Sequence, residues 1–224
     1  MRDCVFLVAD GHMRAVFSAF LGLAHKHTKL GTSPFRFDAE RDLICSGSRD
    51  SGNDPLVMKH GPSLLRPYKE THRHAVVVLD FAFEHKKTPQ EIIAELKRAM
   101  IGAGWEDSRF EVVLIQPELE VWLWQDNPCL QEIFYRNLSP QERASTPPLR
   151  DWLREQTLWP DGHPKPPDPK SAMKQAASAF RAGSPSAVFS EVFRRISTHG
   201  CQDVAFHSLR EALRRWFPLP TGEA

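Results

Sequence analysis

Acidic side chains follow three of the most apolar runs in this 224-residue sequence, close to where each run ends. These acids are Asp10 after residues 4–9, Asp80 within residues 74–81, and Glu118, Glu120 and Asp126 after residues 111–115. If the runs are parallel strands, their carboxyl ends meet at one edge of a sheet, where open α/β folds bind their ligands. Carboxylate oxygens are the ligands that Mg²⁺ and Mn²⁺ prefer. The pattern therefore indicates a cation site that can bind phosphate and activate water.

Four of these acids also have a purely structural explanation. Asp10 precedes a glycine and is typical of a turn, and Asp80 stands where aspartates commonly end strands. Glu118 and Glu120 fall in the first turn of a helix predicted to begin at Pro117, where the helix dipole favours acids by roughly 0.3–1 kcal/mol. The structural and the functional interpretation stay open for these four acids.

The elements that must position these acids alternate along the chain. Residues 4–9, 74–81 and 111–115 predict strands, and a helical pattern follows each of them. Residues 76–79 and 112–115 are continuously apolar, so we expect both to be central rather than edge strands. Strands that alternate with helices predict an α/β protein whose mainly parallel sheet carries helices on both faces.

Local signals place the ends of several elements. The first helix has one apolar face, formed by Met13, Val16, Phe17, Phe20 and Leu21. Thr88 and Glu91 are spaced to cap the start of a second helix, which glycines end at 102 and 104. Residues 35–37 alternate as a short strand would, and residues 41–55 are polar and predict a surface loop.

The character of the sequence changes at Pro140, where prolines become frequent and helical patterns replace strands. We therefore expect residues 1–139 to form the α/β core and residues 140–224 to form a Pro-rich linker and a helical appendage packed on it. Predicted helices in this second part cover residues 151–159, 171–180, 191–197 and 208–217, and Asp168 is placed to cap the second of them.

Composition limits the function classes. A net charge of +1 with ten histidines gives no global field, so binding of nucleic acid has to rely on a local patch. The four cysteines are scattered and the N-terminus lacks a signal pattern, which predicts a reduced, cytoplasmic protein. No apolar run approaches the ~20 residues of a membrane span, and phosphate-binding glycine motifs of nucleotide-binding proteins are absent.

Five short motifs together resemble a known family. They are V-A-D-G at residues 8–11, V-V-V-L-D at 76–80, P-E-L-E-V-W-L-W-Q-D at 117–126, D-P-K-S-A-M-K at 168–174 and F-H-S-L-R-E-A-L at 206–213. In this order they look like the small Toprim-like proteins of bacteria, relatives of the nuclease domain of overcoming-lysogenization-defect proteins. The resemblance implies a Toprim-like (Rossmannoid) sheet and cleavage of phosphodiesters with Mg²⁺ or Mn²⁺.

The resemblance also implies roles for individual residues. Asp10 stands where the family has Glu, Asp80 matches the first Asp of its D-x-D motif, and Glu120 and Asp126 match acids that flank the tryptophans. Asp10, Asp80 and Glu120 are thus the catalytic candidates, and Glu118 joins them and Asp126 as a candidate metal ligand. Lys170 either reaches the acids or a phosphate, or is a solvated lysine in a first helical turn.

The sequence departs from the family pattern at three places. Ala82 replaces the second Asp of D-x-D, Asp10 is one methylene shorter than Glu, and an acid expected near residues 12–14 is missing. Each loss matters because Mg²⁺ demands near-octahedral oxygen coordination. Glu84 is a candidate to replace the ligand lost at Ala82.

Two functions of different classes follow. The first is a component of a bacterial anti-phage defence system that acts on DNA or RNA as a weakened, Mg²⁺-dependent nuclease. The second is a catalytically silent subunit that binds other defence proteins, for example in a methylation-associated complex. The missing D-x-D acid favours the second, whereas the remaining acids favour the first.

Other side chains have alternatives that the sequence leaves open. His72, His74 and His85 surround the strand of Asp80 but lack zinc-ligand spacing, so solvated histidines are the preferred interpretation. Trp122 and Trp124 favour core packing over base stacking. The pairs Arg194–Arg195 and Arg214–Arg215 are either a nucleic-acid patch or solvated helix faces, and we prefer the latter.

Overall fold

The computed structural model describes residues 1–47, 54–82, 86–124, 127–196 and 201–220. Its sheet contains β1 (Arg2–Val8), β2 (Leu43–Cys45), β3 (His72–Asp80) and β4 (Phe110–Ile115), in the order β2-β1-β3-β4. All neighbouring strands are parallel. The register pairs Val8 with Val78 and Asp80 with Ile115, so the carboxyl ends of β1, β3 and β4 lie side by side.

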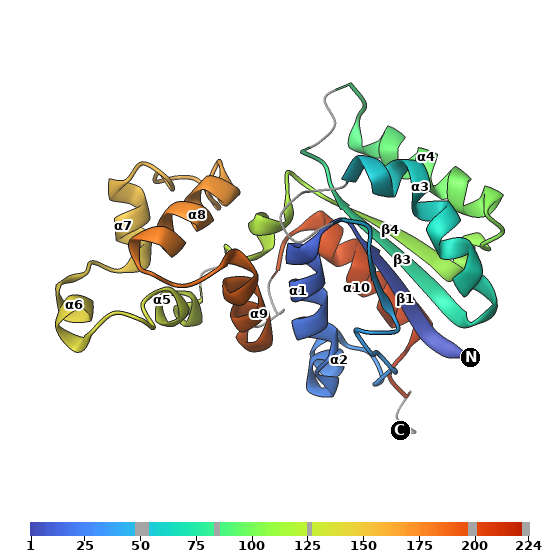
Figure 1. The fold of residues 1–224 in the computed structure, drawn as a ribbon, viewed down its shortest axis with the longest axis horizontal. Helices are drawn as coiled ribbons and strands as arrows, with labels where there is room; N and C mark the ends of the chain where they lie inside the picture. Colours follow the sequence, from blue (N-terminus) through green and yellow to red (C-terminus); the bar gives the residue numbers. More distant parts are fainter. Residues whose placement is uncertain (48–53, 83–85, 125–126, 197–200, 221–224) are drawn as a thin grey trace.

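Helices cover both faces of this sheet (Figure 1). On one face, α3 (Asp54–Leu65) packs on β1 and β3, and α4 (Pro89–Gly102) packs on β4. On the other face, α1 (Gly11–Leu21) and α10 (Val204–Trp216) meet through the rings of Phe20 and Phe206, whose centroids are 6.2 Å apart. The predicted α/β class, with a parallel sheet between two layers of helices, is confirmed.

The remaining helices lie mostly beside the sheet. They are α2 (Ala24–Leu30), α5 (Pro128–Phe134), α6 (Pro140–Ser145), α7 (Leu149–Glu155), α8 (Pro169–Ala179) and α9 (Pro185–Arg195). Figure 1 shows α5, α6, α7 and α8 as a group to the left of the sheet, with α9 between that group and α1. In the described part of the chain, no helix has the length and apolarity that a membrane crossing needs.

Several predicted element ends are confirmed. The five apolar residues expected on one face of α1 are all buried. Thr88 and Glu91 form a capping box at the start of α4, and the Asp168 side chain accepts a hydrogen bond from the Ser171 backbone N–H at the start of α8. These caps satisfy backbone donors that a helix cannot satisfy internally, which is why they are readable from sequence.

The prediction that residues 35–37 form a strand was wrong, as was the prediction of a loop throughout residues 41–55. β2 lies in the supposed loop, and α3 begins there as well. Phe35 alternates with its neighbours for another reason, since its ring stacks between those of His27 and Phe217, with centroids 4.0 and 4.5 Å away. The alternating pattern of residues 35–37 therefore reflects aromatic packing and not a strand.

The position of β4 was also predicted incorrectly. It pairs only with β3 in the described sheet and is an edge strand, whereas β3 is central as expected. All six residues of β4 are nevertheless buried, because α4 and α10 pack against it. Burial by helices leaves the same apolar pattern as burial between two neighbouring strands, so the sequence could not separate the two.

Pro117 does not open a long helix. The Gln116–Pro117 peptide bond is cis, the Glu118 backbone is extended, and only a single 3-10 turn (Leu119–Trp122) follows. The side chains of this turn are all buried, so it has no solvent-facing side on which an amphipathic helix could be built. The next helix, α5, starts at Pro128.

Candidate functional site

Five acids gather where β1, β3 and β4 end, and we call this group the acidic edge. Its members are Asp10, Asp54, Asp80, Glu118 and Glu120. Burial raises the pKa of Asp80 well above its usual range, and the charges of Asp54, Glu120, Asp10 and Glu118 raise it further. Asp10, Glu118 and Glu120, which follow separate strands, thus lie near enough to Asp80 for their charges to act on it, as the shared edge of parallel strands predicts.

Asp80 is the centre of the acidic edge. It is the last residue of β3 and its residue surface is only 8% exposed. Its Oδ1 atom is buried and has no hydrogen-bond partner among the described residues. A buried carboxylate oxygen without a donor costs free energy unless a proton or a cation compensates it. The Asp80 carboxyl group therefore requires either a bound proton or a bound cation.

Asp54 was missed by the sequence analysis. It lies at the first position of α3, is 7% exposed, and its Oδ1 accepts a hydrogen bond from the Asp80 backbone N–H at 2.7 Å. Burial raises the pKa of Asp54, and the charge of Asp10 adds to this effect. The available signal was the Asp54-Pro55 pair, which starts a helix much as Asp168-Pro169 does.

Glu120 is a second buried acid with altered titration. It is 2% exposed in the 3-10 turn after β4. Burial, with the neighbouring charge of Glu118, raises the pKa of Glu120 to about 7, although Lys170 opposes the shift. A carboxyl group with this pKa exchanges its proton near neutral pH, which suits a general acid or base.

Lys170 extends from the first turn of α8 into the acidic edge. Its Nζ lies 3.1 Å from Glu118 Oε2, and its side chain is 44% exposed. Burial lowers the pKa of Lys170, but the charges of Glu120, Glu118 and Asp80 outweigh that and raise it overall. Of the two interpretations of Lys170, the structure thus shows the one in which the lysine reaches an acid, although its side chain also keeps contact with solvent.

The remaining predicted acids are less available. Asp10 caps α1, with its Oδ1 accepting a hydrogen bond from the Met13 backbone N–H at 2.9 Å, so the turn interpretation holds for one of its oxygens. Glu84 and Asp126 lie outside the described residues. Ala82 donates its backbone N–H to Pro117 O at 2.9 Å, which joins the segment after β3 to the segment after β4.

The C-terminal helices hold the turn that carries Glu118 and Glu120. Trp122 Nε1 donates to Asp203 at the start of α10, Trp124 Nε1 donates to Pro169 O at the start of α8, and Lys165 Nζ donates to Val121 O, at 2.8, 2.9 and 2.6 Å. Both tryptophans are buried, so core packing is the correct interpretation of this pair. The two tryptophans position Glu118 and Glu120 indirectly, because their hydrogen bonds attach the backbone of this turn to α8 and α10.

Histidines near β3 serve the structure. His72 Nε2 lies 3.1 Å from the buried carboxylate of Asp42, and the His74 ring stacks on Trp216 with centroids 4.4 Å apart. Both are removed from solvent more than expected, since His72 is buried and His74 is half-buried. His85 lies outside the described residues.

The acidic edge fits a hard divalent cation in its chemistry. Its donors are all carboxylate oxygens, and one of them, Asp80 Oδ1, lacks a partner. As the described side chains stand, however, no three His, Cys, Asp or Glu residues are grouped closely enough to hold a metal ion. Asp10 and Asp54 each use one carboxylate oxygen to accept a backbone N–H, and Glu118 pairs with Lys170. The three buried acids, Asp54, Asp80 and Glu120, are the ones best suited to a cation.

Comparison with known proteins gives no match to any family model, curated protein or solved structure. Any proposal about function must therefore rest on the geometry of the acidic edge and not on relatives of known function.

Proposed function

We propose that this chain is a Toprim-like component of a bacterial anti-phage defence system and that it acts on nucleic acid as a weakened nuclease dependent on Mg²⁺ or Mn²⁺. The observation that carries the proposal is the buried carboxylate of Asp80, which has an oxygen without a partner and lies among further acids whose charges repel it. A purely structural acid in this position is difficult to explain, because hydrophobic residues or paired polar groups would stabilise the fold better.

Of the two possible partners of Asp80, a proton or a cation, the proposal takes the cation, which would also compensate the charges of the neighbouring acids. Asp54, Asp80 and Glu120 would hold the ion, and a bound divalent ion supplies Lewis-acid chemistry that polarises a phosphodiester and activates water. Without a cation, burial raises the pKa of Glu120 to about 7, so this group releases its proton near neutral pH and is then available to hold the ion. Lys170 Nζ is placed beside these acids and can bind a phosphate oxygen of the substrate.

The proposed activity is weakened because of Ala82. With that acid absent, the site has too few oxygens to orient both the attacking water and the leaving group, and orientation is a large part of catalysis. Asp54 supplies one further carboxylate from a different element, at the start of α3. We therefore expect slow cleavage rather than complete loss.

A silent, partner-binding subunit of a multi-protein, methylation-associated defence complex is the second candidate. Two observations favour it: Ala82 occupies the place of a ligand, and Asp10 and Glu118 are already engaged by Met13 N–H and Lys170. A gene for an ATPase or a methyltransferase next to this one would support either role within a defence system.

A nuclease assay tests the proposal. The purified chain is incubated with labelled DNA and RNA, with Mn²⁺ or Mg²⁺ in excess, beside an Asp80→Asn/Glu120→Gln double variant and a Glu106→Gln control. Glu106 is an exposed acid between α4 and β4. We expect slow, metal-dependent cleavage by the wild type and the control and none by the double variant. Absence of cleavage by the wild type would reject the nuclease and leave the silent subunit as the remaining candidate.

A further inference from the structure

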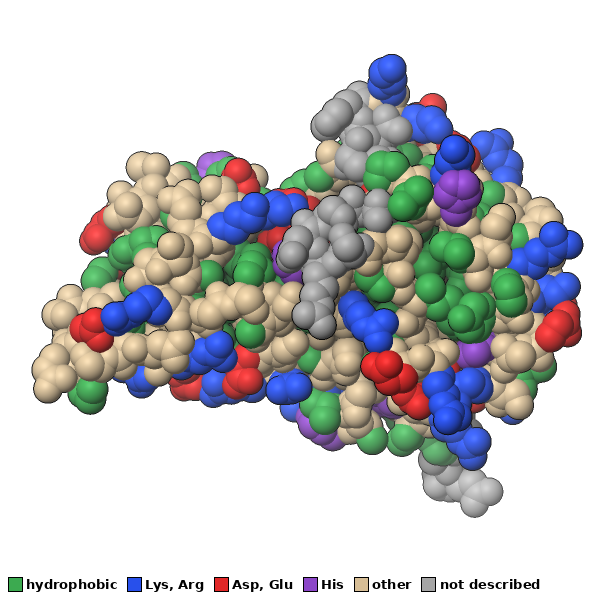
Figure 2. All heavy atoms as spheres, in the orientation of Figure 1, with side chains coloured by type: hydrophobic (Ala, Val, Ile, Leu, Met, Phe, Trp, Pro, Cys, Tyr) green, Lys and Arg blue, Asp and Glu red, His purple; other side chains and the backbone are tan. Residues whose placement is uncertain are grey.

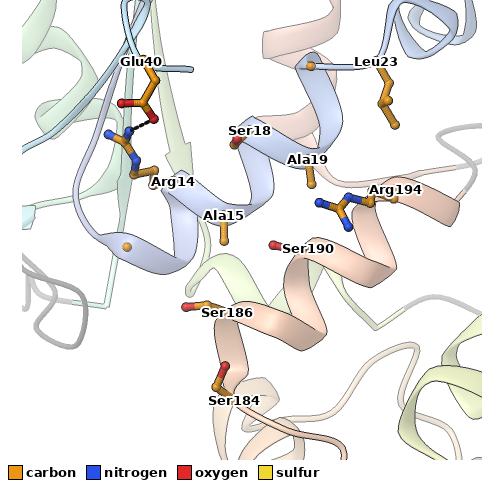
Figure 3. A pocket seen from close by; sticks show the side chains of 12 residues that line it. Arg14, Ala15, Ser18, Ala19, Leu23, Glu40, Ser184, Ser186, Ser190 and Arg194 are labelled. Carbon is orange, nitrogen blue, oxygen red and sulfur yellow. Dashed lines mark hydrogen bonds and ion pairs between the residues drawn. The ribbon is translucent and has the colours of Figure 1, made fainter. Parts of the chain in front are cut away.

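A polar groove runs between α1 and α9 (Figure 3). It has a volume of about 740 Å³. Gly11, which follows Asp10 of the acidic edge, lines one end, and Arg194 at the end of α9 lines the other. The groove thus connects the carboxyl end of β1 with the far ends of both helices.

The two walls of the groove have regular and different side chains. Gly11, Ala15 and Ala19 recur at every fourth position of α1, and Ser186, Ser190 and Arg194 recur at every fourth position of α9. Residues four apart lie on one face of a helix. The small side chains of α1 leave the space open, while Figure 3 shows the α9 side chains directed toward α1.

The polar groups of the α9 wall are free to bind a ligand. Within the described part of the chain, the hydroxyls of Ser186 and Ser190 make no hydrogen bond and Arg194 makes no ion pair. Arg14, near the other end, pairs with Glu40 at 3.2 Å and also donates to the carbonyl of Leu43. Since Glu40 is the single acid among the residues that line the groove, its lining carries a net positive charge.

A chain of phosphates matches these features. An anion is repelled by the uncompensated acidic edge but attracted by Arg194, and hydroxyls and guanidinium groups are the usual partners of phosphate oxygens. The bulk charge of the protein does not explain such binding, because Figure 2 shows Lys and Arg side chains dispersed over the visible face. A cavity of this size holds part of one strand and excludes a duplex.

We propose that the groove binds the phosphodiester backbone of a single nucleic-acid strand as the strand leaves the acidic edge. The proposal rests on the proposed function, since it takes the acidic edge as the place where the strand is acted upon. It adds the path of the substrate and a preference for single strands, with Arg194 as a phosphate contact and the small residues of α1 as the element that admits the backbone.

Fluorescence anisotropy measures the binding of labelled single-stranded DNA and RNA oligonucleotides to the chain. The measurement is made in EDTA, which removes divalent cations, so it tests the groove separately from the cation site. Arg194→Glu reverses the charge in the groove, and Ala15→Phe fills the groove without a change in charge. Arg98→Glu is the matched control, because Arg98 is exposed on α4, on the other face of the sheet. Circular dichroism and thermal melting of each variant show whether the fold is retained.

We expect the wild type to bind single strands more tightly than duplexes, and Arg194→Glu to weaken this binding by about tenfold. The slope of log affinity against log salt should become shallower by about 0.7 or more, the value for one lost phosphate contact on a single strand. Folded Ala15→Phe should also bind more weakly, and Arg98→Glu should bind as the wild type does.

Three outcomes would overturn the groove. The first is an equal loss of binding for Arg194→Glu and Arg98→Glu, which would indicate an effect of bulk charge alone. The second is competition by inorganic phosphate that is as effective as competition by an unlabelled strand. The third is no strand binding by the wild type in EDTA. If the last result occurred in a chain that binds Mn²⁺, the groove would fail while the cation site stood. If the chain bound the strand but did not bind Mn²⁺, the cation site would fail while the groove stood.

Discussion

The carboxylate of Asp54 accepts a hydrogen bond from the backbone N–H of Asp80, and thus fixes the start of α3 beside the end of β3. The two residues are 26 positions apart in the chain and both are more than nine-tenths buried. Asp54 therefore has two opposite effects. Its oxygen satisfies a buried donor, whereas its charge repels the Asp80 carboxylate and raises the pKa of that group.

Two substitutions separate these effects. Asp54→Asn keeps an oxygen that can accept from Asp80 N–H and removes the charge, so the cation-free protein should melt a few degrees higher at neutral pH. Asp54→Ala removes both, and loss of a buried acceptor should cost about 1–3 kcal/mol. Thermal melting in EDTA measures both. Equal destabilisation by the two variants would contradict this account, because it would show that the acceptor oxygen contributes nothing and that loss of the charge is unfavourable.

The pH dependence of stability should report Glu120. A glutamate in an unfolded chain titrates near ~4.3, whereas burial raises the pKa of Glu120 to about 7 in the fold. Between these values the folded protein holds a proton that the unfolded chain has released. The free energy of unfolding should therefore fall as pH rises through this window, by about 3–4 kcal/mol for this group.

Urea unfolding at a series of pH values in EDTA checks this expectation. Glu120→Gln should make the decline shallower, and Lys170→Ala should extend it to higher pH, because Lys170 lowers the pKa of Glu120. Lys174→Ala is the matched control, since Lys174 is exposed one turn further along α8. If stability is unchanged across this window in the wild type, Glu120 is not a buried titrating acid.

A third prediction concerns the central strand. Val78 is fully buried in β3 and pairs with Val8 on one side and Val113 on the other. Val78→Asp should unfold the protein, because an unpaired buried charge costs several kcal/mol against a total stability of roughly 5–15. The same change at Ile101, which is 52% exposed on α4, should shift stability by no more than ~0.5 kcal/mol. An unchanged thermal transition for Val78→Asp would contradict the placement of β3.

The layers of the fold and the placement of the acids after strands were predictable from sequence, because both depend on local patterns. Apolar runs revealed β1, β3 and β4, and Asp10 and Asp80 follow from the direction of parallel strands. The edge position of β4 was not predictable, since helices bury it as completely as strands would. Nor was the 3-10 turn after Pro117, whose form depends on packing against the C-terminal helices.

The part of the site that sequence could not supply comes from long-range contacts. Asp54 lies in a polar run typical of a loop, and only the tertiary position of α3 brings it to Asp80. The contact of Lys170 with Glu118 likewise joins residues 52 positions apart. Arg194 was interpreted as part of a solvated helix face, and only the packing of α9 on α1 shows that it lines a groove.

The central claim is that the acidic edge binds a divalent cation through Asp54, Asp80 and Glu120. Titration calorimetry with Mn²⁺ on the purified chain measures this directly, beside the Asp80→Asn/Glu120→Gln double variant and the Glu106→Gln control. Binding by the wild type and the control, with none by a folded double variant, is the predicted result. Equal Mn²⁺ binding by the double variant, or no binding of Mn²⁺ or Mg²⁺ by the wild type, would contradict it.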